Sequence, residues 1–285
     1  MSWIFYSLIA AFSLATADAI SKKALTRTDE YVIAWVRQGY ALPFLAIPFF
    51  FTGIPHLDST FWLTLLFLLP LDVTAIILYL KAIRLSPLSL TIPFIALSPV
   101  FVIITAWIFL GELPDISGLT GIILITFGAY LLNVRATRDG LLGPLKAIRR
   151  EKGSALMIIV ALIYSITATL GKVAVQHSHP VFFGAFYPFV LAVVFTIIVG
   201  FKGKLPKVTS HPRMFLCIGL FTAIMILSHF MAISLIDVAY MISVKRCSLI
   251  FSVIYGWTLF NEINITERLI GSILMIGGVV AITLF

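Results

Sequence analysis

The sequence predicts an all-α integral membrane protein of ten transmembrane helices, arranged as two inverted five-helix repeats. Three observations lead to this prediction: the hydropathy of the chain, a match between its two halves, and the distribution of its basic residues. Hydrophobic residues make up 61% of the chain and charged residues 11%, and the mean hydropathy is +1.10. A soluble domain needs a more polar surface than this composition supplies, so we expect the chain to lie in a bilayer.

Ten apolar segments are long enough to cross about 30 Å of hydrocarbon as helices. Their approximate ranges are 3–21, 31–52, 61–83, 87–110, 116–134, 154–176, 181–201, 213–235, 238–260 and 266–284. The connections between them are short, apart from a basic stretch at 135–153. We interpret that stretch as a solvated tether between the repeats, and a short amphipathic helix on the inner leaflet is the alternative.

The two halves of the chain match when one is shifted by 150 residues without a gap, so that Trp107 aligns with Trp257 and Lys22 with Lys172. The basic loops do not follow this match. Sixteen of the twenty Lys and Arg residues lie in or beside the loops after the first, third, fifth, seventh and ninth segments, and the other four lie within segments. Since Lys- and Arg-rich loops stay on the cytoplasmic side, the second repeat is inverted relative to the first.

The same distribution predicts a topology for the chain in the cell membrane. Both termini face outside, and a basic linker at 135–153 lies in the cytoplasm between a first repeat at 1–134 and a second at 154–285.

Prolines and glycines predict different roles for different segments. The second segment contains Pro43 and Pro48, and the fourth contains Pro87, Pro93 and Pro99. Both segments should be kinked, because each proline removes a backbone hydrogen bond. The fifth and tenth segments carry glycines that favour close helix packing rather than ligand binding: Gly118, Gly121, Gly128, Gly271, Gly277 and Gly278.

Composition and motifs exclude several other classes of protein. The two cysteines, Cys217 and Cys247, lie in apolar segments without disulfide or metal-ligand spacing, so we expect no metal and no cofactor. The net charge of +8 is accounted for by orientation signals beside anionic membrane lipids, and no nucleic-acid partner is expected. No HExxH or GxSxG motif occurs, so an enzyme is not expected.

A few ionisable residues fall well within the predicted spans, where each costs at least about 2.5 to 3.5 kcal/mol on the insertion scale. They are Asp18, Arg37, Asp72, Lys172, His229, Lys245 and Arg246. Lys245 and Arg246 are adjacent and lie roughly 10 Å below the start of their helix. We expect Asp72 or Asp237 to neutralise one of them and a phosphate or carboxylate of the substrate to neutralise the other. A closed structural ion-pair network and snorkelling to the outer surface are the alternatives.

The remaining intramembrane residues are expected to have other roles. Asp18 and Arg37 should form a local pair that serves as an inner gate. His229 should be neutral with one hydrogen bond, and a proton-sensitive or substrate-orienting role is the alternative. Lys172 lies near the outer end of its helix and should snorkel outside the site. Tyr79 and Tyr240 should complete the cavity.

Two helix-end patterns carry a family resemblance: WIFLGELPDISGLTG from Trp107 to Gly121, and WTLFNEINITERLIG from Trp257 to Gly271. Together with the glycines that follow them, they resemble the drug/metabolite transporter superfamily, in its ten-helix form with two EamA repeats. This resemblance implies alternating access and a central cavity lined mainly by helices 1, 3, 4, 6, 8 and 9. The signature glutamates Glu112 and Glu262 should accept backbone N–H groups at helix starts, with proton coupling as the alternative.

The Lys245–Arg246 pair is also similar to the phosphate-binding pair of the phosphate-sugar branch of this superfamily. The leading hypothesis is therefore a secondary active transporter for a small anionic or zwitterionic organic metabolite. A broad exporter of amino acids or drugs, a flippase for a lipid-linked substrate and an integral-membrane enzyme are the alternatives. Coupling to protons or to a counter-substrate stays open, and so does the choice between monomer and homodimer.

Overall fold

The computed structural model describes residues 2–85, 92–134, 152–260 and 269–284. All the secondary structure of these residues is helical, as predicted. The elements are α1 Ser2–Leu25, α2 Glu30–Gly39, α3 Leu42–Thr52, α4 Ser59–Leu85, η1 Ile92–Leu97, α6 Ser98–Leu110, α7 Ile116–Val134, α9 Lys152–Gln176, α10 Pro180–Phe201, η3 Leu205–Thr209, α11 Pro212–Ile233, α12 Val238–Lys245, α13 Ser248–Phe260 and α14 Leu269–Leu284. The predicted linker at 135–153 lies almost entirely outside the described residues.

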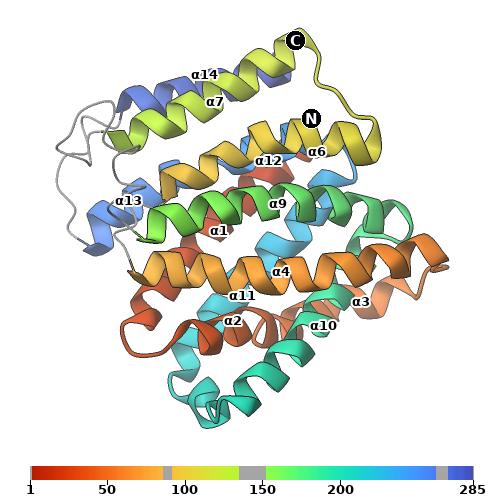
Figure 1. The fold of residues 1–285 in the computed structure, drawn as a ribbon, viewed down its shortest axis with the longest axis vertical. Helices are drawn as coiled ribbons and strands as arrows, with labels where there is room; N and C mark the ends of the chain where they lie inside the picture. The colour runs from red at the N-terminus through yellow and green to blue at the C-terminus, as the bar shows by residue number, and fades with distance from the viewer. Residues whose placement is uncertain (1, 86–91, 135–151, 261–268, 285) are drawn as a thin grey trace.

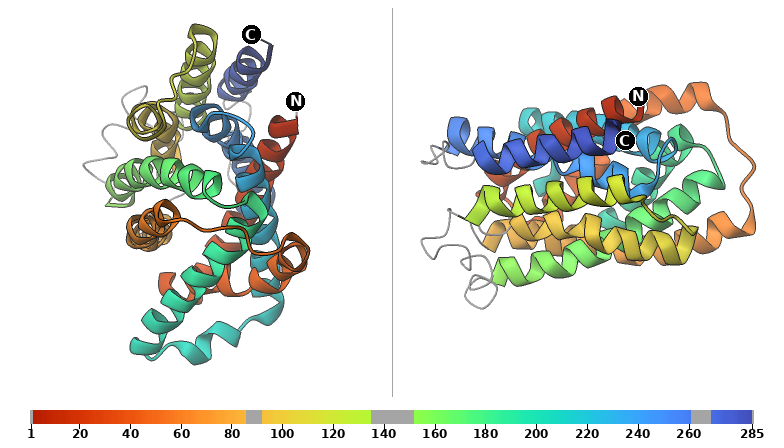
Figure 2. Two further views of the ribbon diagram at one scale, coloured as in Figure 1. Left: turned by 90° about the vertical axis from the view of Figure 1, so that its right-hand side faces the viewer. Right: turned by 90° about the horizontal axis from the view of Figure 1, so that it is seen from above.

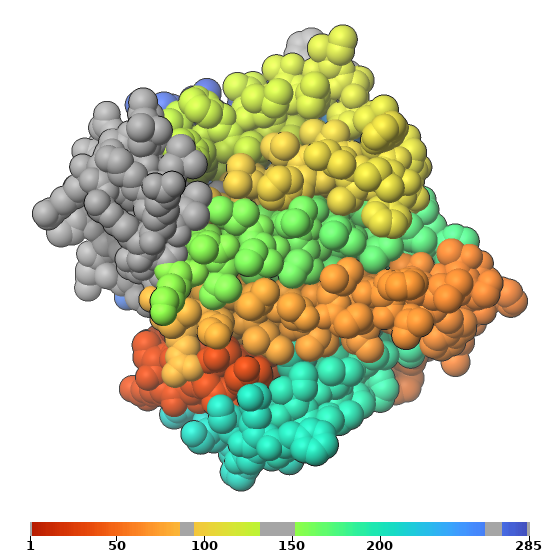
Figure 3. Space-filling view, in the orientation of Figure 1, coloured from red at the N-terminus to blue at the C-terminus, as the bar shows by residue number. Residues whose placement is uncertain are grey.

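Seven helical stretches of the described chain are long and apolar enough to cross a membrane, and three shorter apolar helices accompany them. The shorter ones are Phe94–Leu110, Ile116–Leu131 and Ile270–Thr283. Large apolar side chains are exposed on the outside of the bundle, among them Phe67 on α4, Ile159 on α9 and Ile108 on α6. Figure 3 shows the face on which these three helices lie side by side. An apolar exterior of this kind suits lipid rather than water, and it indicates an integral membrane protein.

Both segments that were expected to be kinked, the second and the fourth, are interrupted. The second predicted segment divides into α2 and α3, which are separated by Tyr40 and Ala41, and Pro43 occupies the first turn of α3. The fourth divides into the 3-10 helix η1 and the α-helix α6, with Pro99 in the first turn of α6. Proline is tolerated in a first turn because the N–H group that it lacks has no partner within the helix.

The ninth predicted segment is also interrupted, which the sequence did not predict. A continuous helix over 238–260 was expected, but α12 ends at Lys245 and α13 begins at Ser248. The N–H groups of Cys247 and Leu249 bond to carbonyls three residues back, at 3.0 and 2.9 Å, which is the spacing of a 3-10 turn. No proline or glycine lies between Val238 and Tyr255 to announce this break.

The first helix of each half of the chain packs among helices of the other half. In one layer α9 lies between α4 and α6, and in the other α1 packs against α11 and α13 (Figures 1 and 2). Since α1 and α9 are the matching first helices of the two halves, each half completes the packing of the other. The layers therefore enclose a space to which both halves contribute residues.

At one end of the bundle α7 and α14 pack against each other through glycines (Figure 1). A Cβ atom on Gly128 would lie 2.7 Å from the carbonyl oxygen of Gly271, and one on Gly278 would lie 2.6 Å from that of Gly121. Both distances are shorter than a non-bonded contact allows, so these positions need glycine. The paired glycines let the two backbones touch, as expected of scaffold helices.

Candidate functional site

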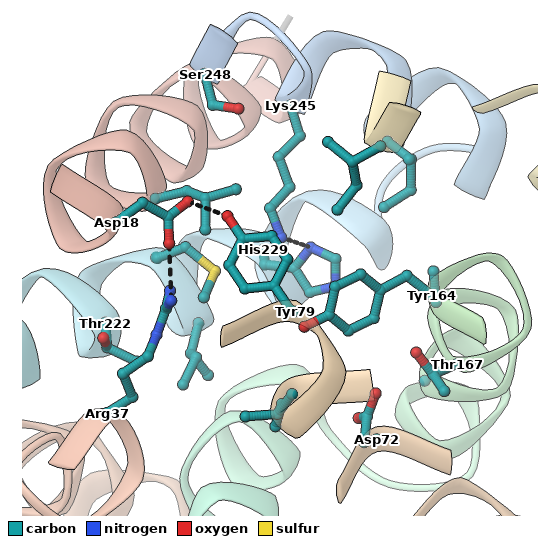
Figure 4. A pocket seen from close by; sticks show the side chains of 18 of the residues that line it. Asp18, Arg37, Asp72, Tyr79, Tyr164, Thr167, Thr222, His229, Lys245 and Ser248 are labelled. Atoms are coloured by element: carbon teal, nitrogen blue, oxygen red, sulfur yellow. Dashed lines mark hydrogen bonds and ion pairs between the residues drawn. The ribbon is translucent and has the colours of Figure 1, made fainter. Parts of the chain in front are cut away.

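A partly open cavity of about 200 Å³ lies between the two layers. Its charged side chains are Asp18, Arg37, Asp72, Lys245 and Arg246. They come from α1, α2, α4 and the end of α12, and further lining residues come from η1, α9, α10, α11 and α13. The family resemblance implies a cavity lined mainly by helices 1, 3, 4, 6, 8 and 9. Here the second and seventh segments also line it, through residues of α2 and α10. Figure 4 shows the side chains of this cavity.

Asp18 has hydrogen bonds on both carboxylate oxygens. Arg37 Nη1 lies 2.7 Å from Oδ1, and the Tyr79 hydroxyl donates to Oδ2 at 2.7 Å. All three residues are at most 7% exposed. The structure thus brings together Asp18 and Arg37, and it adds Tyr79 to the pair. A buried ion pair with this many charge-assisted hydrogen bonds is internally compensated.

Lys245 and Arg246 lie where α12 gives way to the 3-10 turn, so their side chains enter the cavity beside an irregular backbone. Lys245 Nζ lies 3.2 Å from His229 Nδ1 (Figure 4). The Arg246 Nε and Nη2 groups both donate to the Ser98 hydroxyl, at 2.9 and 2.5 Å. Ser98 is the first residue of α6.

Neither cation forms an ion pair with a described residue. The expectation that Asp72 or Asp237 neutralises one of them is therefore wrong for direct contact. Asp237 precedes α12 at the opposite end from the pair, and Asp72 is bound instead by Tyr187. The cavity lining contains three Lys or Arg side chains and two carboxylates, so one positive charge exceeds the negative charge when all five are ionised.

Lys245 Nζ and His229 Nδ1 are hydrogen-bonded at 3.2 Å. An ammonium group can only donate, so with Lys245 charged the Nδ1 atom accepts and carries no proton. A neutral imidazole then holds its single proton on Nε2. Its ring lies edge-on to Phe230 at a centroid distance of 4.9 Å. His229 therefore fixes the position of the Lys245 head group without neutralising its charge.

Asp72 accepts a hydrogen bond from the Tyr187 hydroxyl to Oδ2 at 2.8 Å. Each partner is near a helix-interior proline, because Asp72 follows Pro70 by two residues and Tyr187 directly precedes Pro188. Figure 4 shows Asp72 well apart from Lys245, with Tyr164 and Thr167 beside it. Tyr164, Thr167 and Tyr187 also line the cavity, and none of them was predicted as a site residue. A signal was present on α9, because the i, i+3, i+7 spacing of Tyr164, Thr167 and Gly171 puts these three on one helix face.

Tyr240 does not line the cavity, contrary to expectation. Its hydroxyl donates to Asp115 Oδ1 at 2.9 Å and accepts the Asp115 N–H at 3.1 Å. Its ring fills the space beside Gly118, where a Cβ atom would lie 2.2 Å from it. The N–H of Gly118 and the Tyr240 hydroxyl hold the pKa of the Asp115 carboxyl below its ordinary value. Tyr240 thus joins α12 to the start of α7.

Lys172 does not snorkel. It is 7% exposed and forms an ion pair with Glu112, and it donates to the Ile236 carbonyl at 2.9 Å. The other carboxylate oxygen of Glu112 accepts the N–H of Val238, the first residue of α12, at 3.0 Å. Glu112 therefore does accept a backbone N–H group at a helix start, but the helix is α12 rather than the next one in the chain. Glu262 lies outside the described residues.

The comparisons with known proteins identify the family. A search of the curated proteins gives no match. A solved crystal structure, whose description names no function, superposes on this chain with a TM-score of 0.73, covering 99% of this chain and 95% of the other. The two are 13% identical, so this likeness shows the shared fold alone. The model of the EamA-like transporter family matches residues 1–134 and 151–284, which together make up nearly the whole sequence, and the chain belongs to this family of membrane transporters.

Proposed function

We propose that this chain is a secondary active transporter that moves a small anionic or zwitterionic organic metabolite across the cell membrane by alternating access. The observation that carries the proposal is the adjacent pair Lys245 and Arg246, buried in the central cavity without an ion-pair partner among the described residues. Uncompensated cations are costly inside a membrane. A phosphate or carboxylate of the substrate supplies the missing charge.

The contacts of Arg246 support a role in binding. Two of its N–H groups share one neutral hydroxyl, that of Ser98, and a guanidinium carries five N–H donors in a planar fork. The donors that remain fit the two oxygens of a carboxylate or phosphate. Lys245, held by His229, adds a second positive charge beside them.

The size of the cavity supports a small substrate. Its volume of about 200 Å³ is below the roughly 300 to 1,000 Å³ typical of pockets for drug-sized ligands. A small metabolite therefore fits better than a broad range of drugs or a lipid-linked substrate, which are the alternative cargoes. We propose no catalytic activity for the chain, because the charged groups of the cavity are accounted for by pairing with one another or by binding the substrate.

The proposal includes a membrane topology. The seven long helical stretches and the three shorter apolar helices make ten spans in two inverted repeats, 1–134 and 154–285, joined by a cytoplasmic linker at 135–153. Both termini then face outside the cell membrane. Asp18 and Arg37 act as an inner gate. A proton or a counter-substrate is the coupled partner, and the chain acts as a monomer or a homodimer.

Counterflow in proteoliposomes tests the proposal. Proteoliposomes are loaded in turn with unlabelled 3-phosphoglycerate, dicarboxylates and amino acids. Uptake of the same compound in labelled form is then measured for the wild type and for Lys245→Gln and Arg246→Gln. Both variants should lose saturable uptake while remaining monodisperse. Lys207→Gln and Arg213→Gln remove the same charges from exposed positions and should transport normally. Wild-type uptake by both cavity variants would refute the proposal.

A further inference from the structure

We propose that Asp72 forms a second subsite, with Tyr187 and Tyr164, that binds a positively charged amino group of the substrate. This inference rests on the proposed function and deepens it, because it assigns the substrate both an anionic group and an ammonium group. The anionic group binds at Lys245 and Arg246, and the ammonium group binds at Asp72.

The contacts of Asp72 carry the first step. Its carboxylate lines the cavity and is hydrogen-bonded by two neutral hydroxyls, that of Tyr187 at 2.8 Å and that of Thr167. No described Lys or Arg forms an ion pair with it. A carboxylate accepts about four hydrogen bonds. Asp72 therefore retains acceptor capacity toward the cavity, unlike Asp18, which has a guanidinium on one oxygen and a tyrosine hydroxyl on the other.

The surroundings of Asp72 suit an alkylammonium ion. Tyr164 and Tyr187 both line the cavity, and Figure 4 shows Tyr164 and Thr167 beside the carboxylate. The ring of Tyr164 lies 6.2 Å from that of Tyr79, centroid to centroid, so aromatic rings extend along this wall. A cation between a carboxylate and aromatic faces gains both a salt bridge and cation–π attraction.

The separation of the charges carries the last step. If Asp72 were the internal counter-ion of Lys245 or Arg246, it would form an ion pair with one of them, and it does not. Lys245 is held instead by His229 on α11, and Asp72 is held by Tyr187 on α10. The cavity thus presents cations at the end of α12 and, on α4, a carboxylate that forms no direct ion pair with a described residue. A substrate with opposite charges at two ends satisfies both.

Matched ligands test this arrangement. Binding to the purified full-length protein in nanodiscs is measured for pairs that differ only in the amino group: alanine and propionate, leucine and 4-methylpentanoate, phenylalanine and 3-phenylpropionate, glutamate and glutarate. The proteins are the wild type, Asp72→Asn, Arg246→Gln and the control Asp58→Asn, which removes a carboxylate from a partly exposed position beside His177, outside the cavity. In the wild type, at least one zwitterion should bind about tenfold or more tightly than its matched anion.

Asp72→Asn should weaken the zwitterion about tenfold or more and change the matched anion less than about threefold, while Asp58→Asn keeps the preference. The inference is overturned if no pair shows a zwitterion preference, if the preference survives in Asp72→Asn, or if that variant instead removes only the pH dependence of counterflow. Arg246→Gln should weaken both members of a pair. If it leaves anion binding unchanged, the proposed function fails, whatever the result for Asp72.

Discussion

Glu112 and Lys172 form an ion pair that joins the two halves of the chain at the beginning of α12. Glu112 follows α6 in the first half, and Lys172 belongs to α9 in the second. Glu112 also accepts the N–H of Val238, and Lys172 donates to the carbonyl of Ile236. The pair thus holds one end of the short helix whose other end carries Lys245 and Arg246.

A double-mutant cycle on this pair should show strong coupling. Glu112→Gln and Lys172→Gln should each lower the thermal stability of the purified protein, because each leaves one buried charge unpaired. The sum of the two single losses should exceed the loss in the double variant. The coupling free energy should lie at about 0.5 to 3 kcal/mol. Melting temperatures in detergent measure it. Additive losses would mean that the charges are separately solvated.

A second cycle concerns Asp18 and Arg37. Asp18→Asn and Arg37→Gln should each reduce folded protein or transport more than the double neutral variant, since the buried partner loses its counter-charge. Tyr79→Phe removes one neutral donor from the Asp18 carboxylate and should cost about 1.5 to 3 kcal/mol, less than leaving a buried charge unpaired. Fluorescence-detected size exclusion and counterflow measure the two effects. Equal losses in Tyr79→Phe and Arg37→Gln would contradict the ion-pair assignment.

Adjacent glycines in α14 give a matched test of helix packing. A Cβ atom on Gly278 would lie 2.6 Å from the Gly121 carbonyl oxygen, whereas one on Gly277 would meet no atom within 4 Å. Gly278→Ala should therefore lower the melting temperature by several degrees, and Gly277→Ala should leave it unchanged or raise it slightly. The opposite order of stabilities would exclude the close contact of α7 with α14.

Topology can be tested independently of stability. The basic loops predict that both termini face outside. A periplasmic reporter enzyme fused after the C-terminal residue should be active, and a green fluorescent protein fused at the same place should remain dark. Fluorescence with a silent periplasmic reporter would reverse the assignment and place the 135–153 linker outside.

Local sequence patterns predicted much of the fold. Hydropathy predicted helices, proline predicted kinks in the segments that break before Pro43 and Pro99, and glycine spacing predicted close helix packing at α7 and α14, though not that these two helices contact each other. Each of these effects acts within one helix or between two backbones that touch. The closeness of Asp18 and Arg37 was also accessible, because both lie at similar depth in consecutive spans.

Features that depend on distant packing were missed. Depth below a helix end suggested that Lys172 reaches water, but Glu112 and the carbonyl of Ile236 cover that end. The break after Lys245 has no proline or glycine to announce it. Tyr240 bonds to Asp115, at the start of a helix more than a hundred residues earlier, instead of lining the cavity. The sequence offered Asp72 as the nearest intramembrane anion to Lys245. The sequence could not show that the hydroxyl of Tyr187, on a helix more than a hundred residues later, donates a hydrogen bond to that carboxylate.

Substitutions at Arg246 separate its charge from its shape. Arg246→Lys keeps the positive charge but loses the planar fork, of which two N–H groups bind Ser98. It should raise the apparent KM for an anionic substrate about tenfold or more, because a point charge replaces bidentate contact. Ser98→Ala leaves the Arg246 guanidinium intact but removes the hydroxyl that positions it. This variant should therefore raise KM by a smaller factor, with little change in the maximal rate. Concentration-dependent counterflow measures both parameters, with Arg213→Lys as the exposed control. A normal KM in Arg246→Lys would mean that only the charge of this residue matters.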